Sequence, residues 1–331
     1  MIDTDTPMTA PGADNDRAGA RRRFLQLAGG ATVAMGLAAC GGSGDSSPTP
    51  TPTPTGTATP TPTSTSTVAL DVDYLNFALQ LQYLTAQYFA LATTGSGVAA
   101  SLLTGTGTQG TVSGGAQITF SDALLGQYAR EIATRELAQL GILRSAIGSA
   151  AVSAQPSIDL SSSVTGGFTR LARAGGLIGP ADTFDAFSSD LNFLLGAFIL
   201  QDVVVTAYIG ATPAITNLVL VNVAADALAA KSYEAALIRS QLYGRGTAAR
   251  TATDQLSGAR DALDGATDLD QGVTGNATTS NITPATIDGL VAGRTPAQVL
   301  NVLYTNRAAV TGGGFYPNGV ISTYFKTSGA N

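Results

Sequence analysis

The segment AAKSYEAALIRSQLYG, residues 229–244, has the spacing of an amphipathic helix. Ile238 and the other large aliphatic side chains in this region fall on one stripe, which we expect to face the protein interior. Lys231 and Glu234 fall on the same stripe, although charged side chains are rarely buried unless they are paired. The chain contains only one other lysine, Lys326, so a lysine beside a carboxylate on this face requires an explanation.

Helical periodicity extends over much of the chain. It predicts four long helices, at residues 72–93, 121–148, 184–211 and about 222–243. The connection between the second and third is long, residues 149–183, whereas the connection between the third and fourth is short. This order predicts an all-α four-helix bundle with one long crossover. We expect the bundle to occupy residues 69–244, and residues 245–331 to form a C-terminal extension of short helices and loops packed on it.

Polar residues interrupt the apolar stripe of each predicted helix at mid-length. In chain order these residues are Gln82, then Glu136 and Gln139, then Gln201, then Lys231 and Glu234. Both pairs have i,i+3 spacing, which places their members on the same helix face. Di-metal carboxylate bundles have this layout, with one Glu on each of two helices and a Glu-x-x-His motif on each of the other two.

Longer motifs make a family resemblance specific. They are LNFALQLQYLTAQYF at residues 75–89, LNFLLGAFILQDVVVTAYIGA at 191–211, SYEAALIRSQLYG at 232–244, RTPAQVLNVLY at 294–304 and GGFYPNG at 313–319. In this order they resemble the ferritin-like domain family, which includes plant desiccation-related proteins and many exported bacterial proteins. The similarity covers roughly residues 70–319, and it implies a ferritin-like bundle with a di-metal site in its core.

The ligand set that the resemblance implies is altered in this chain. The two single Glu positions are Gln82 and Gln201, and the two Glu-x-x-His motifs become Glu136 with Gln139 and Lys231 with Glu234. Only Glu136 keeps the expected ligand type. A neutral amide is a weaker ligand than a carboxylate, and an ammonium group competes with a metal ion. We therefore expect these six positions to form a degenerate site with no metal, no cofactor and no catalytic residue.

Our hypothesis is that Lys231 takes the metal position and bridges Glu136 and Glu234, while the glutamines supply the remaining hydrogen bonds. The protein would then be a non-catalytic scaffold, and the resemblance implies a role in stress or desiccation tolerance. Two alternatives stay open. Glu136 and Glu234 could hold a single hard cation such as Mg²⁺ or Ca²⁺. Lys231 could instead act as the base or nucleophile of a metal-free enzyme.

The N-terminal region has the features of an export signal. RRRFLQLAGGATVAMGLAAC, residues 21–40, begins with a basic stretch that contains the twin arginines Arg21 and Arg22, continues with a short apolar run and ends in small residues. LAAC resembles a bacterial lipobox, which predicts lipidation of Cys40. Residues 41–68 are rich in Pro and Thr and predict a disordered, semi-rigid stalk. We expect a protein anchored to a membrane of the cell envelope, on the periplasmic or outer-membrane face.

Composition excludes several kinds of site. The chain has no histidine and one cysteine, so neither an internal disulfide nor a zinc or haem site built on histidine is possible. Its net charge is −6 and it has no basic stripe, which argues against a nucleic-acid partner. No pattern identifies a protein partner. Asp202 lies off the polar stripe of its helix, and the acidic segment GATDLDQGVTG, residues 265–275, predicts a loop.

Overall fold

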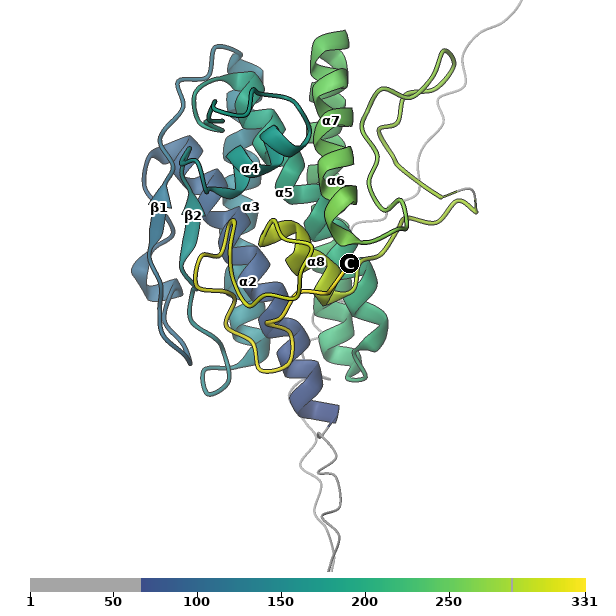
Figure 1. Cartoon of the computed structure of the whole chain (residues 1–331). Coiled ribbons are helices and arrows are strands. Elements are labelled where there is room, and N and C mark those ends of the chain that lie inside the picture. Colours follow the sequence, from purple (N-terminus) through teal and green to yellow (C-terminus); the bar gives the residue numbers. More distant parts are fainter. Residues whose placement is uncertain (1–66, 287) are drawn as a thin grey trace, which may run out of the picture. The chain divides into compact units, whose positions relative to one another are not determined.

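The computed structural model describes residues 67–286 and 288–331. The predicted signal, residues 1–40, and nearly all of the predicted stalk, residues 41–68, lie outside the described residues, and so do Arg21, Arg22 and Cys40. The described chain is mostly helical, which confirms the predicted all-α fold. Its longest helices are α2 (Thr67–Thr94), α3 (Ala123–Ile147), α5 (Asp190–Ala211) and α6 (Leu218–Gly244) (Figure 1).

Capping side chains set where these helices begin. Asp122 accepts hydrogen bonds from the backbone N–H groups of residues 124 and 125, at 3.0 and 3.2 Å, and α3 begins directly after it. Ser189 accepts from the N–H of Asn192 at 3.2 Å, so α5 begins at Asp190 and not at residue 184 as its periodicity predicts. Asn217 caps α6 in the same way, so that this helix begins at Leu218, before its predicted start at about residue 222.

The connections between the long helices contain short elements. Before α3 lie the 3-10 helix η1 (Ala100–Leu102) and the strand β1 (Val112–Gly114), and the long crossover contains β2 (Ile158–Leu160) and α4 (Gly167–Ala174). The 3-10 helix η2 (Thr212–Ala214) joins α5 to α6. β1 and β2 pair in parallel, with Val112 opposite Ile158. The connections on either side of α3 therefore lie side by side, which the sequence pattern does not predict.

Helix α5 is the central element of the bundle. Its side chains are apolar on all sides, which is typical of a helix enclosed by protein. The stretch Asp190–Ala214 is long and apolar enough to cross a membrane by length and composition, but 83% of its most apolar window is buried within the described chain. Helix α5 packs chiefly against α6, and α2 packs chiefly against α3. The two pairs enclose the core positions of the bundle.

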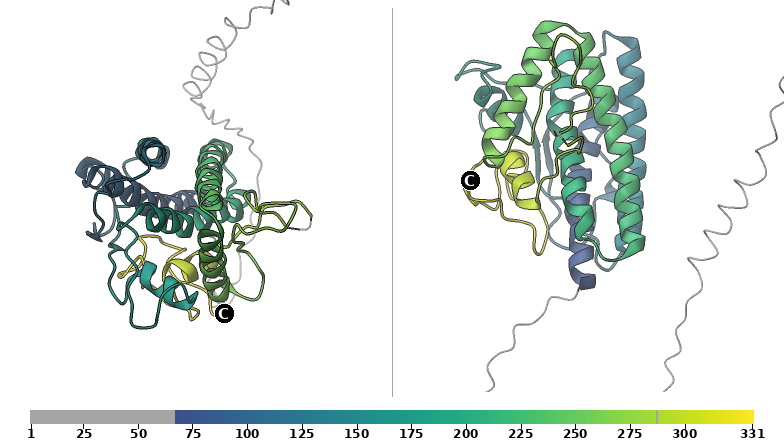
Figure 2. Two further views of the ribbon diagram at one scale, coloured as in Figure 1. Left: turned by 90° about the horizontal axis from the view of Figure 1, so that it is seen from above. Right: turned by 90° about the vertical axis from the view of Figure 1, so that its right-hand side faces the viewer.

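The C-terminal part of the chain lies against one side of the long helices (Figures 1 and 2). It contains α7 (Thr247–Asp264) and α8 (Pro296–Leu303), and Thr295 caps α8 with Pro296 at the first helical position. Tyr316 is fully buried, and its hydroxyl donates to the backbone carbonyl of Gln80 on α2 at 2.9 Å. This part of the chain therefore completes the core beside the first bundle helix.

Candidate functional site

The charged pair of the opening segment lies in the interior of the bundle. Lys231 and Glu136 have no exposed side-chain surface, and the side chain of Glu234 is 3% exposed. The Nζ atom of Lys231 makes a direct hydrogen bond to Oε1 of Glu136. It lies 3.7 Å from Oε2 of Glu234, one helical turn away on α6. The ammonium group thus stands between two carboxyl groups from α3 and α6, as the sequence pattern predicts.

Two of the predicted glutamines hold these carboxyl groups in place. Gln82 on α2 donates from Nε2 to Oε2 of Glu136 at 2.5 Å and to the backbone carbonyl of the same residue at 2.8 Å. Gln201 on α5 donates from Nε2 to Oε1 of Glu136 at 2.8 Å and to Oε2 of Glu234 at 3.1 Å. All four long helices therefore meet at one polar cluster, which we call the Lys231 cluster: Gln82, Thr85, Glu136, Gln201, Lys231 and Glu234.

Thr85 belongs to this cluster although the polar pattern did not single it out. Its hydroxyl donates to Oε2 of Glu136 at 2.6 Å and accepts from Nζ of Lys231 at 3.2 Å. Its position three residues after Gln82 on the same face of α2 is a signal that could have revealed it. Gln139 is buried, but no hydrogen bond joins its side chain to the cluster within the described residues, and its Oε1 has no partner there.

Burial controls the protonation of Glu234. It raises the pKa of this carboxyl to about 8, and the negative charge of Glu136 adds to the rise, while Lys231 and Arg135 oppose it. The Arg135 side chain is half exposed, and its Nε lies 3.7 Å from Oε1 of Glu234. Glu234 therefore carries a proton for most of the time at neutral pH. A proton on Glu234 leaves Lys231 and Glu136 as the ion pair of the cluster.

Tyr208 is a second residue near the cluster that sequence reasoning missed. Burial raises the pKa of its hydroxyl well above the usual value, and the charges of Glu136 and Glu234 raise it further. Its position on α5, two turns after Gln201 on the same face, could have indicated this. The phenol is therefore held neutral beside the two carboxyl groups.

The donor set of the cluster does not fit a di-metal centre. Each oxygen of Glu136 already accepts two hydrogen bonds: Oε1 from Lys231 and Gln201, and Oε2 from Gln82 and Thr85. Within the described residues, no group of three or more His, Cys, Asp or Glu side chains is arranged to hold a metal ion. The ammonium group lies between the two carboxyl groups and repels a cation from that position.

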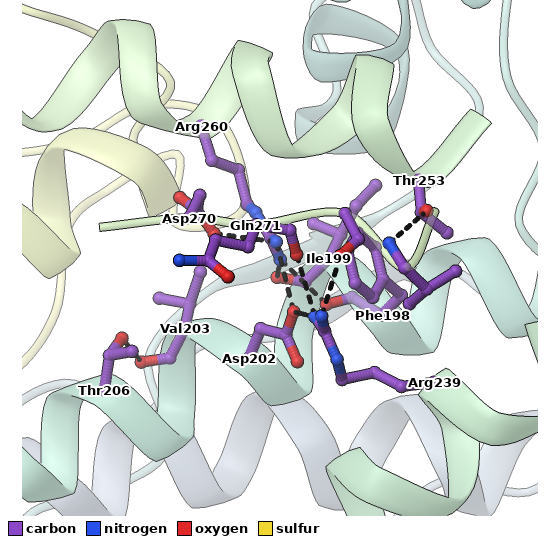
Figure 3. A network of polar contacts seen from close by, with 12 residues as sticks. Phe198, Ile199, Asp202, Val203, Thr206, Arg239, Thr253, Arg260, Asp270 and Gln271 are labelled. Atoms are coloured by element: carbon purple, nitrogen blue, oxygen red, sulfur yellow. Dashed lines mark hydrogen bonds and ion pairs between the residues drawn. The ribbon is translucent and has the colours of Figure 1, made fainter. Parts of the chain in front are cut away.

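A second buried network forms around Asp202, which follows Gln201 on α5 and lies on a different face of that helix (Figure 3). Its carboxylate pairs with Arg239 at 2.7 Å and with Arg260 at 3.2 Å. Arg260 also pairs with Asp270 at 2.7 Å and stacks its guanidinium 4.5 Å from the ring centre of Phe198. Asp202 is therefore committed to arginine and takes no part in the Lys231 cluster, as its off-stripe position predicts.

The same network fixes the loop predicted at residues 265–275. Arg294 is fully buried, lies 2.6 Å from Asp264 and contacts Asp270 directly. Arg239 donates to backbone carbonyls of the segment that follows α7, at residues 271, 272, 281 and 282. These contacts give Arg239 and Arg294 structural partners in the interior. We interpret this network as the attachment of the C-terminal segment to the bundle.

Comparisons with known proteins agree with this architecture. A family model described as a ferritin-like domain matches residues 70–244, more than half of the chain. The chain is 28% identical over 268 residues, 75% of its length and 83% of the relative's, to the ferritin-like catalase Nec2 of Nesocodon mauritianus. It is 30% identical over 181 residues, 54% of each chain, to the desiccation-related protein PCC13-62 of Craterostigma plantagineum. No solved structure matches the chain.

Proposed function

This chain belongs to the ferritin-like domain family, and we propose that it is a non-catalytic member whose core uses a lysine in place of metal ions. One observation carries the proposal: Nζ of the fully buried Lys231 stands between the carboxyl groups of Glu136 and Glu234. A divalent cation bound there would have to displace the ammonium group. It would also break hydrogen bonds to both oxygens of Glu136.

The proposed role of the cluster is structural. A buried ion pair is tolerated when its charges balance and its remaining lone pairs accept hydrogen bonds, and Lys231 with Glu136 meets both conditions. Because partners come from four helices, a shift of any one helix along its axis would break hydrogen bonds or ion pairs of the buried cluster. The cluster thereby favours one register of the bundle. Fixing the register of packed helices is the best documented role of buried polar groups.

The cellular part of the proposal rests on sequence and on similarity. Arg21 and Arg22 with Cys40 support export followed by lipid anchoring, with residues 41–68 as the stalk. Similarity to a desiccation-related protein supports a role in stress tolerance at the cell envelope. The protein would act there as a scaffold that its lipid tethers to the membrane.

Elemental analysis tests the proposal most directly. The protein is expressed in medium supplemented with iron, manganese and zinc, purified without chelators and analysed for metal content. We expect far less than a stoichiometric amount of each metal, and no disproportionation of hydrogen peroxide, the reaction named for one relative. Stoichiometric metal that is lost in a Glu136→Gln, Glu234→Gln double variant would overturn the proposal.

A reconstructed site provides the positive control. The variant carries Gln82→Glu, Gln139→His, Gln201→Glu and Lys231→Glu, which restores most of the carboxylate and imidazole donors of a di-metal bundle. We expect this variant to retain metal under the same conditions. If the reconstructed variant contains metal and the wild-type protein does not, these side chains and not the purification explain the difference.

A further inference from the structure

A pocket lies between the bundle and the C-terminal part of the chain. It has a volume of about 360 Å³ and is lined by residues of α5 and α6 and of the segments 268–286 and 289–292. Mostly apolar pockets of this size with a few polar groups are typical sites for small molecules. No member of the Lys231 cluster is among the described residues that line it. We propose that this pocket binds a small apolar amine, a hydrocarbon body that carries a protonated amino group.

The wall of the pocket determines the body of the ligand. Most of its surface is apolar, and the side chains that provide this surface are Val205, Ala235, Leu269, Ile282, Pro284 and Val291. A hydrocarbon that displaces water from this surface is stabilised by the hydrophobic effect. A sugar or a nucleotide would leave many of its polar groups without partners against the same wall. The body of the ligand is therefore apolar.

Asp202 provides an unpaired hydrogen-bond acceptor at the pocket. Arg239 and Arg260 both donate to its Oδ2, at 2.7 and 3.2 Å (Figure 3). No hydrogen bond from the described residues reaches its Oδ1, although the side chain is only 13% exposed. A carboxylate oxygen that is largely removed from water is stabilised by a donor, most strongly by a charged one. An ammonium group in the pocket supplies this donor.

Arg239 lines the pocket but has no nitrogen left for a ligand. Its Nε, Nη1 and Nη2 atoms all donate, in five hydrogen bonds, to Oδ2 of Asp202 and to backbone carbonyls of residues 271, 272, 281 and 282. A guanidinium group has five N–H donors, so these bonds use its full capacity. Arg239 is the only base among the described residues that line the pocket. An anionic ligand would therefore find no charged donor there.

The other polar groups of the pocket also favour a cation. The hydroxyl of Ser232 donates to the backbone carbonyl of Leu228 at 2.8 Å, and that of Thr206 donates to the carbonyl of Val203 at 2.9 Å. Asp268 lines the pocket and is exposed, and no ion pair within the described residues neutralises it. Its negative charge attracts a positively charged ligand toward the opening. The pocket thus offers acceptors and negative charge, which a protonated amine requires.

Isothermal titration calorimetry of the full chain tests the pocket. The probes are cyclohexylamine, benzylamine and 1-adamantylamine, each matched with the carboxylate on the same body: cyclohexanecarboxylate, benzoate and 1-adamantanecarboxylate. We expect at least one amine to bind once per chain with a Kd below about 1 mM, and its carboxylate to bind at least about tenfold more weakly. If no amine binds below about 1 mM, or if the carboxylate binds within about tenfold of its amine, the proposal is wrong.

Two exposed serines of α6 locate the binding. Ser232→Phe places a ring in the pocket, whereas Ser240→Phe places the same ring outside its lining residues. We expect the first variant to weaken amine binding at least about tenfold and the second to change it by no more than about twofold. Unchanged binding in Ser232→Phe would overturn the proposal, because the amine would then bind elsewhere.

Asp202→Asn tests the acceptor itself. The amide keeps the shape of the side chain and removes the charge that faces the amine, so we expect binding to weaken at least about tenfold. Unchanged binding in a folded Asp202→Asn protein would contradict the assigned role of this carboxylate, and if the variant does not fold, Ser232→Phe decides. This inference goes beyond the proposed function and does not depend on it. Metal found in the core would contradict the proposed function alone, whereas absent amine binding contradicts only the pocket.

Discussion

Replacing Lys231 by Met tests the charge balance of the core. The substitution keeps an unbranched side chain of similar length and removes only the ammonium group. At about pH 7.5 Glu234 is largely protonated, since its pKa is raised to about 8, so Lys231 balances the carboxylate of Glu136. Without the lysine, that carboxylate stays buried and unpaired. Removing one partner of a buried pair costs about 3–5 kcal/mol, and we expect the free energy of unfolding to fall by that amount.

The deficit should shrink on acidification. A carboxyl whose folded-state pKa is raised above its unfolded value contributes stability below that unfolded value and loses it as pH rises through the folded-state pKa. Between about pH 7.5 and 5.5 the carboxyl pair of the variant can take up one further proton, while the wild-type cluster binds little more. One pH unit corresponds to about 1.4 kcal/mol, so two units restore up to about 2.7 kcal/mol. We expect a deficit of about 1–2 kcal/mol at the lower pH.

Urea unfolding followed by circular dichroism at both pH values measures these differences. The control is Lys326→Met at an exposed position, which should change stability by no more than about 0.5 kcal/mol. If Lys231→Met costs no more than Lys326→Met, the buried-pair reasoning is wrong. If its cost is equal at both pH values, the protonation argument fails.

Two further predictions concern the second buried network and the membrane anchor. Arg294→Met should destabilise the protein by about 3–5 kcal/mol, because it leaves Asp264 and Asp270 buried without their shared partner, whereas the exposed Arg307→Met should have almost no effect in the same unfolding assay. Cys40→Ser should abolish labelling by a fatty-acid analogue and release the protein from the membrane fraction, and a variant that stays membrane-bound would refute lipid anchoring at this cysteine.

The sequence alone determined the bundle and the contents of its core. Apolar residues repeating with the helical period define an inward stripe whatever the helix packs against, so polar residues on that stripe must meet in the interior. This reasoning brought Gln82, Glu136, Gln201, Lys231 and Glu234 together, and the structure unites them in one cluster. Helix caps such as Asp122 are also local in the sequence, because a cap acts on N–H groups only two and three residues away.

The tertiary structure decided which atoms pair. Thr85 joins the cluster and Gln139 does not, because the helical period gives the face on which a side chain lies but not which atoms come within hydrogen-bond distance. The attachment of residues 265–294 through Arg239 and Arg294 was equally beyond the sequence pattern. Those arginines bind backbone carbonyls and aspartates far along the chain. Such contacts leave no periodic pattern in the sequence from which they could be predicted. They exist only because packing brings distant segments into the reach of one guanidinium group, whose five donors fix the geometry once they are buried.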